Sequence, residues 1–124
     1  MGKKHFTHGR LKVFMTIILA VILIVLVVVC AKKIKLAQNE KNIIGTWKNS
    51  SSENVITVQD SDTLILYNDI PEAGLYHGNA SYHFSYTDTI CVTQDDISAE
   101  FCVDVDENQL IIYFAGQVYL VLQK

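Results

Sequence analysis

The chain has 124 residues, half of them hydrophobic, with ten basic and thirteen acidic residues and a formal charge of −3. That length allows one small domain, and the composition is not that of a disordered or collagen-like chain. Apolar and charged residues are separated along the sequence, which leaves a single segment of 81 residues, 44–124, able to form a globular core. A core of that size excludes a multidomain enzyme and a polytopic transporter.

The first predicted element is a transmembrane α-helix over residues 13–31. This segment of nineteen residues contains no charged side chain, and Lys12 and Lys32 flank it. A helix of that length reaches roughly 28 Å at about 1.5 Å per residue, close to the roughly 30 Å of a bilayer's hydrocarbon core. A basic tail, 1–12, precedes it and a lysine-rich juxtamembrane collar, 32–43, follows it. The lipid bilayer is therefore the first predicted partner.

The apolar segment can be a retained signal-anchor or a cleaved signal peptide. Its length favours an uncleaved anchor, because signal peptides have a shorter apolar core of about 7–15 residues. Cleavage after Ala31 is an alternative, since Val29-Cys30-Ala31 ends in a small residue. A lipoprotein cysteine at Cys30 is a further alternative, but Val29 occupies a position where such sites have Gly, Ala or Ser.

Flanking charge does not settle the orientation of the helix in the membrane. Four basic residues precede the segment and four follow it, so the positive-inside rule gives no preference. The segment is synthesised first, the rest of the chain is acidic, and a cysteine pair suits an oxidising compartment. We therefore expect a single-pass protein of the cell membrane with a cytoplasmic N-terminus and an extracytoplasmic C-terminal domain.

The domain at 44–124 is strongly acidic. It contains two lysines, no arginine and twelve acidic residues, which gives it a formal balance of −10. Such a domain is repelled by phosphate backbones and by anionic lipid heads. We therefore expect no nucleic-acid partner.

Alternation of apolar and polar residues predicts an all-β domain. Strands are predicted at 43–48, 55–59 and 63–67, followed by the longest loop, 68–74, which holds the only proline. Aromatic residues then alternate with polar ones over 82–86, and turn residues recur every eight to twelve positions to the end of the chain. The pattern predicts about eight short strands in an antiparallel meander or barrel.

The two last hairpins allow a prediction of register. In the final hairpin, a two-residue turn at Gly116-Gln117 would place Phe114 opposite Tyr119 and Ile112 opposite Val121.

In the preceding hairpin, a turn over 95–98 places Val92 opposite Phe101 on one face and Cys91 opposite Cys102 on the other. Directly opposed residues in an antiparallel pair can have the Cβ separation that a disulfide needs. The sequence therefore predicts a Cys91–Cys102 disulfide in an oxidising compartment, with two free thiols as the alternative.

Chemistry-bearing motifs are weak in this sequence. His77 and His83 lack a third ligand for a metal, and Asp104-x-Asp106-x-Asn108 lacks the glycine and glutamate of a calcium loop. The acidic residues fall mostly at turns, and no nucleophile motif or phosphate-binding glycine loop is present. We therefore expect a protein that is not an enzyme and that uses no cofactor.

Gly45-Thr46-Trp47 at the start of the β domain resembles the opening of lipocalin-like (calycin) barrels. The resemblance is closest to short lipocalin-like domains behind signal or anchor segments in bacterial surface proteins. Those domains also end in an apolar strand and a lysine, as 118–124 does here. The resemblance implies that Trp47 plugs one end of a barrel. The domain departs from lipocalins in having no arginine to cover that tryptophan and in having about half their length.

These observations together predict a membrane-anchored, non-catalytic binding or interaction module. One alternative is a barrel that binds a small apolar ligand with the last hairpin and with Trp47, Tyr76, Tyr82, Phe84 and Tyr86. Another is a structural or regulatory partner of another envelope protein, contacted through an exposed strand edge. A cavity of about 300 Å³ or more would favour the ligand, and a filled core with an exposed apolar patch would favour the partner protein.

Overall fold

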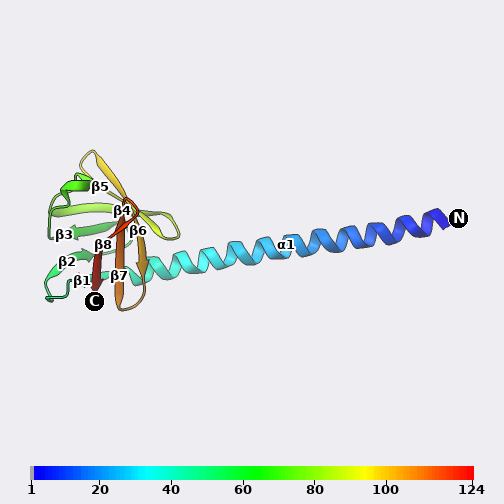
Figure 1. The fold of residues 1–124 in the computed structure, drawn as a ribbon, viewed down its shortest axis with the longest axis horizontal. Coiled ribbons are helices and arrows are strands. Elements are labelled where there is room, and N and C mark those ends of the chain that lie inside the picture. The colour runs from blue at the N-terminus through cyan, green and yellow to red at the C-terminus, as the bar shows by residue number, and fades with distance from the viewer. Residues whose placement is uncertain (1) are drawn as a thin grey trace. The chain divides into compact units, whose positions relative to one another are not determined.

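The computed structural model describes the backbone of residues 2–124 and the side chains of residues 9–124. One long helix is followed by eight strands, as Figure 1 shows. Contacts divide the chain into two compact units, Met1–Ile34 and Lys35–Lys124. The predicted fold class, an N-terminal apolar helix followed by a small antiparallel β-barrel, is confirmed.

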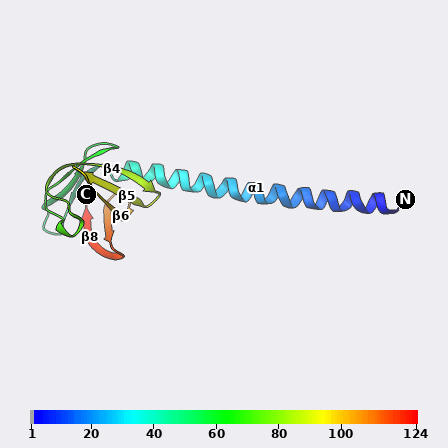
Figure 2. The same cartoon turned by 90° about the horizontal axis from the view of Figure 1, so that it is seen from above.

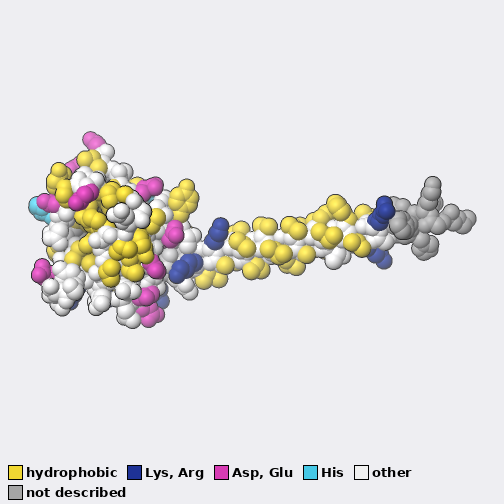
Figure 3. All heavy atoms as spheres, in the orientation of Figure 1, with side chains coloured by type: hydrophobic (Ala, Val, Ile, Leu, Met, Phe, Trp, Pro, Cys, Tyr) yellow, Lys and Arg dark blue, Asp and Glu magenta, His cyan; other side chains and the backbone are white. Residues whose placement is uncertain are grey.

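The helix α1 runs from Gly2 to Asn42. It includes the predicted apolar segment and continues without a break through the lysine-rich residues that follow it. Apolar side chains cover the helix between two groups of basic side chains, as Figure 3 shows. Among the described residues, this is the one helix long and apolar enough to cross a membrane.

The eight strands form one closed antiparallel barrel in which each strand pairs with its neighbours in sequence (Figures 1 and 2). A short 3-10 helix, η1, lies at Pro71–Ala73 between the third and fourth strands. The strands are β1 Gly45–Lys48, β2 Asn54–Val58, β3 Thr63–Leu66, β4 Gly78–Tyr86, β5 Thr89–Gln94, β6 Ile97–Val105, β7 Gln109–Phe114 and β8 Gln117–Gln123.

Alternating burial along the strands gives the barrel its core. In β6, Phe101, Val103 and Val105 are buried, while Cys102 and Asp104 between them are exposed. This is the period of two expected when one face of a strand lines a core. The other strands add further inward-facing side chains and, with Ile43, Ile70 and Leu75 from outside the strands, the core cluster has nineteen buried apolar residues.

The last turns of α1 belong to the same unit as the barrel. Asn39 and Ile43 are 2% and 1% exposed, and the Asn39 side-chain amide donates to the carbonyl of Thr87 at 2.7 Å, in the turn between β4 and β5. The Trp47 indole N–H in turn donates to the carbonyl of Ile43 at 2.8 Å. These contacts fix the point at which the chain enters the barrel.

The predicted register of the β5–β6 hairpin is wrong by two residues. Cys91 faces Glu100, and Cys102 faces Thr89, because the strands are joined by a two-residue turn at Asp95-Asp96 rather than by a four-residue turn. A shift of two residues leaves every side chain on its own face, so the apolar pattern does not distinguish the two registers. Both cysteines are free thiols, and the direct cross-strand pairing behind the predicted disulfide is absent.

The predicted turn of the β7–β8 hairpin is also wrong, by one residue. The turn residues are Ala115 and Gly116, with φ of +52° and +79°, and a β-bulge on the strands then shifts the register again. Positive φ at both central residues matches the twist that a two-residue hairpin requires. Ile112 therefore faces Leu120, and Val121 points outward, where it is 49% exposed.

Candidate functional site

The interior of the barrel is almost completely filled by its own side chains. The remaining void measures about 30 Å³, and fourteen residues line it, all of them apolar or aromatic. Ligand pockets have volumes of about 300–1,000 Å³. A void of this size is therefore roughly a tenth of the smallest pocket that a small molecule would need.

The loop between β3 and β4 contributes to this filling. Ile70 and Leu75 pair with each other across η1 and are 7% and 0% exposed, and both line the central void. Across the loop, the Tyr119 hydroxyl on β8 donates to the Glu72 carboxylate at 3.2 Å. Burial and the hydrogen bond to Glu72, a negatively charged partner, raise the pKa of Tyr119. The loop therefore holds apolar side chains in the space that a ligand would occupy.

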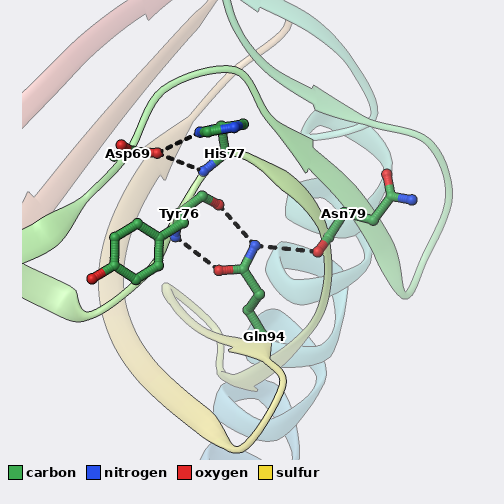
Figure 4. A network of polar contacts seen from close by, with 5 residues as sticks. All are labelled: Asp69, Tyr76, His77, Asn79 and Gln94. Carbon is green, nitrogen blue, oxygen red and sulfur yellow. Dashed lines mark hydrogen bonds and ion pairs between the residues drawn. The ribbon is translucent and has the colours of Figure 1, made fainter.

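A network of polar contacts fixes the second half of this loop, and Figure 4 shows it. The Gln94 side chain accepts from the backbone N–H of Tyr76 at 2.8 Å and donates to the Tyr76 carbonyl at 2.7 Å. The same amide donates to the carbonyl of Asn79 at 3.3 Å. The Asp69 carboxylate accepts from the backbone N–H of His77 and lies 2.6 Å from the His77 ring nitrogen Nδ1, which lowers the Asp69 pKa. Because the network holds backbone groups in place, it positions the loop.

Trp47 has a covering cation that sequence reasoning missed. The tryptophan is completely buried, and the Lys124 ammonium lies 5.0 Å from the centre of its ring. The same ammonium donates to the carbonyl of Asn42, at the C-terminal end of α1, at 3.0 Å. Gly45 leaves room for this lysine, since a Cβ at that position would lie 2.5 Å from Lys124 Cε. The domain from residue 44 onward has no arginine, and the structure places Lys124 over Trp47.

The structure brings only three of the five predicted ligand-binding residues together, because Trp47, Tyr82 and Phe84 lie in or against the core cluster while the other two lie outside it. Tyr76 and Tyr86 are 56% and 70% exposed, whereas Trp47 and Tyr82 are buried. The Tyr82 hydroxyl donates to the carbonyl of Asp60 at 2.7 Å, and the Tyr82 ring packs edge-on against Phe84 at 6.3 Å. Burial, with nearby carboxylates, raises the Tyr82 pKa to about 12. None of these five residues lines the central void.

The described side chains form no group of three or more His, Cys, Asp and Glu residues that could hold a metal ion. His83, Cys91 and Glu100 occupy aligned positions on β4, β5 and β6, but the described contacts include no hydrogen bond between their side chains. Asp106 accepts from two backbone N–H groups in the turn between β6 and β7, which lowers its pKa. Its carboxylate therefore stabilises a turn.

The candidate functional surface lies on the β7–β8 hairpin. Residues 108–123 contain no charged side chain. On the outer face of the hairpin, Ile111 faces Val121 and Tyr113 faces Val118. The two valines are 49% and 58% exposed, and Ile111 and Tyr113 are half-buried. In Figure 3, apolar side chains gather over the part of the barrel where Figure 1 places β7 and β8, with acidic side chains around them.

The barrel is closed at this surface by a very short contact between its first and last strands. Among the described residues, β1 and β8 share one residue pair, Lys48 with Gln123. The other neighbouring strands share between three and six pairs. Residues 117–122 of β8 therefore lack a strand partner on the side away from β7. A signal for this edge was present in the sequence, where 108–123 is uncharged and apolar or aromatic at eleven of its sixteen positions.

Comparison of the chain with known protein families, with curated proteins and with solved structures finds no match. The closed eight-stranded antiparallel barrel behind an apolar helix is consistent with the lipocalin-like barrel that Gly45-Thr46-Trp47 suggested. The arrangement that the barrel offers for function is an apolar, uncharged outer surface beside an unpaired strand edge.

Proposed function

We propose that this chain is a single-pass membrane protein that displays a small, acidic, lipocalin-like β-barrel as a non-catalytic interaction module. The observation that carries the proposal is the β7–β8 hairpin, which is apolar on both of its faces and exposed on the outer one. Strands that are apolar on both faces are typical of sheets covered on both sides. An exposed apolar patch rimmed by polar residues marks a site of protein interaction.

The helix supplies the proposed membrane anchor. Its segment 13–31 carries no charge, and none of its helical faces is polar, as is typical of a helix surrounded by lipid. A cleaved signal sequence would also be apolar and lie near the N-terminus. The apolar core of 13–31 is longer than that of a signal peptide, which favours retention of the segment. We propose a cytoplasmic N-terminus and an extracytoplasmic barrel, because an acidic domain is held off an anionic membrane surface.

The state of the acidic residues favours binding over catalysis. Asp60, Asp69 and Asp106 accept backbone N–H groups in turns and loops, and their pKa values are lowered. A general acid needs a carboxyl group whose pKa is raised by burial within a cleft. The pKa of Asp62 is raised, but by the neighbouring Asp60 in an exposed turn.

A pocket for a small apolar ligand is less well supported. Its walls are apolar, as such a ligand requires, but the void measures about 30 Å³, and the buried loop residues Ile70 and Leu75 are among those that line it. A hydrophobic fluorophore added to the full chain in detergent-free nanodiscs separates the two functions. Saturable uptake beyond that of empty nanodiscs, displaced by fatty acid, would favour the ligand, and fluorescence equal to that of empty nanodiscs is expected for an interaction module.

The proposed location is tested by protease accessibility in sealed vesicles, with different tags at the two ends of the full chain. In vesicles whose cytoplasmic face is outward, protease should remove the N-terminal tag and leave the C-terminal tag intact. Detergent should then expose the C-terminal tag, which controls for a barrel that resists digestion. Removal of the C-terminal tag before detergent is added would reverse the proposed orientation, and a mature chain starting at Lys32 would show that the anchor is cleaved.

A further inference from the structure

The free edge of β8 offers the backbone groups of an unpaired strand. Beyond the single Lys48–Gln123 pair, residues 117–122 have a hydrogen-bonded neighbour on the β7 side, and the described residues supply none on the other. Exposed edges of this kind are templates for pairing with another strand. Natural edge strands are protected by charge, by proline or by a β-bulge. This edge has no charge and no proline in its sequence Gln117-Val-Tyr-Leu-Val-Leu122, although it carries the β-bulge at Tyr119.

Charge indicates which strand can approach this edge. The domain from residue 44 onward carries a balance of −10, so two copies of it repel each other over most of their surfaces. Residues 108–123 are the longest uncharged stretch in that domain. A basic partner would be attracted to the acidic turns instead. Two copies that meet through their β7–β8 hairpins therefore bring no carboxylates of these hairpins together.

The edge is also complementary to itself. If two β8 strands pair antiparallel about the midpoint between Tyr119 and Leu120, Val118 of one copy lies opposite Val121 of the other. Both valines are exposed on the outer face, whereas Tyr119 and Leu120, which would also oppose each other, both line the barrel interior. Opposed residues of an antiparallel pair point to the same face. This register therefore keeps inner residues with inner residues and outer with outer.

We propose that two copies of this chain pair through their β8 strands in this register and form a symmetric dimer with a continuous sheet. The contact is isologous, since the same six residues meet on both copies. The four outward valines then join the outer faces of the two hairpins into one apolar band. The inference names the partner of the proposed interaction module and so rests on that proposal. Confinement of both copies to one membrane would raise their effective concentration.

Cysteine cross-linking in the full chain tests the register. In a background in which Cys30, Cys91 and Cys102 are replaced by serine, V118C and V121C chains carrying different tags are co-expressed and mildly oxidised. The mixed sample should give a disulfide-linked heterodimer, because the two positions face each other at a separation suited to a disulfide. Either variant alone should give none, since two copies of position 118 lie three residues apart along the strands, about 10 Å.

A charge placed on the edge tests whether the pairing holds the dimer together. Val121→Lys should abolish the dimer measured by sedimentation of the full chain in detergent, and Tyr86→Lys, an exposed apolar position outside the hairpin, should leave it intact. Unchanged circular dichroism of both variants excludes misfolding. A monomeric parent chain, cross-links in either single variant, or cross-links only to a different protein would each overturn the proposal.

Dimerisation and location have independent readouts. A monomer whose tags show the proposed topology would refute the β8 pairing and leave the membrane proposal intact. A cross-linked dimer with its C-terminal tag on the cytoplasmic face would refute the location and leave the pairing intact.

Discussion

Replacement of Lys124 by methionine should destabilise the barrel, because this terminal side chain joins three parts of the fold. Its ammonium lies over the Trp47 ring and donates to the carbonyl of Asn42, while its stem passes Gly45. Methionine keeps an unbranched apolar stem and removes only the charge and the donor. Lys124→Arg keeps a cation that also interacts well with indole rings, so it should retain most of the stability.

The expected loss follows from two contacts. A cation about 5.0 Å from a ring centre is within the range of a cation–π interaction, which contributes about 0.5–1 kcal/mol at an exposed site. The hydrogen bond to a carbonyl at the C-terminal end of a helix contributes about another 0.5–1 kcal/mol, since a cation there opposes the partial negative charge of the helix end. We therefore expect Lys124→Met to lower the free energy of unfolding by about 1–2 kcal/mol.

Urea denaturation of the full chain in a non-ionic detergent measures this loss. The chain contains one tryptophan, so intrinsic indole fluorescence reports on Trp47 alone. The urea midpoint should fall in Lys124→Met, while the slope of the transition stays unchanged. Lys48→Met is the matched control, because Lys48 is exposed on β1 and has no side-chain partner among the described residues.

Two results would refute the reasoning about Lys124. If Lys124→Met unfolded at the same urea concentration as the parent chain, the ammonium would contribute nothing measurable. If Lys48→Met lost as much stability as Lys124→Met, the effect would be one of net charge in an acidic domain, and the position over the indole ring would be irrelevant.

Four further changes test other parts of the barrel. Gly45→Ala should cost about 1–3 kcal/mol in the same assay, because Gly45 has φ of +138° and the added Cβ would displace Lys124. Tyr82→Phe should cost about 1 kcal/mol, the value of one buried hydrogen bond, with its rigid ring retained. Asp60 has its pKa lowered from 3.8 to about 2 by hydrogen bonds from Thr63 and Asp62. It therefore stabilises the fold above its ordinary pKa and loses that contribution as the pH falls toward 2, so Asp60→Asn should flatten the acid limb of a stability–pH profile. Cys91 and Cys102 should both react with a maleimide in the folded chain without reductant, Cys102 faster, and a mass two hydrogens lower would contradict the observed β5–β6 register.

The sequence was sufficient to predict the elements of the fold. The uncharged run predicted one helix, because a membrane span needs about twenty apolar residues. The period of two predicted eight strands, because burial of one face of a strand makes apolar and polar residues alternate. The registers were harder. In β5–β6 the pattern is unchanged by a shift of two residues, and only the conformation of Asp95-Asp96 selects one of the two alignments. That conformation depends on backbone geometry that composition does not encode.

The candidate site was less predictable than the fold. The aromatic residues Tyr76 and Tyr86 suggested a pocket, but they lie on the outside, because the direction of a side chain in a loop or at a strand end is not fixed by alternation. Lys124 was unnoticed as the partner of Trp47, since these residues are 77 positions apart and meet only when β1 and β8 close the barrel. Contacts between the two ends of a chain leave no local pattern.

The same closure supports the proposal that this barrel acts through its surface and not through its interior. In a barrel whose first and last strands share one residue pair, the apolar side chains of β8 are needed inside to fill the core, and Leu120 and Leu122 serve that purpose. The outer residues Val118 and Val121 do not fill the core, and positions on a solvent-facing side of a sheet are usually polar. Apolar residues at those two positions, in a domain that carries twelve acids elsewhere, raise the free energy of the isolated copy in water. The proposed β8 pairing would offset part of that cost, because Val118 of one copy would lie beside Val121 of the other and cover part of its apolar surface.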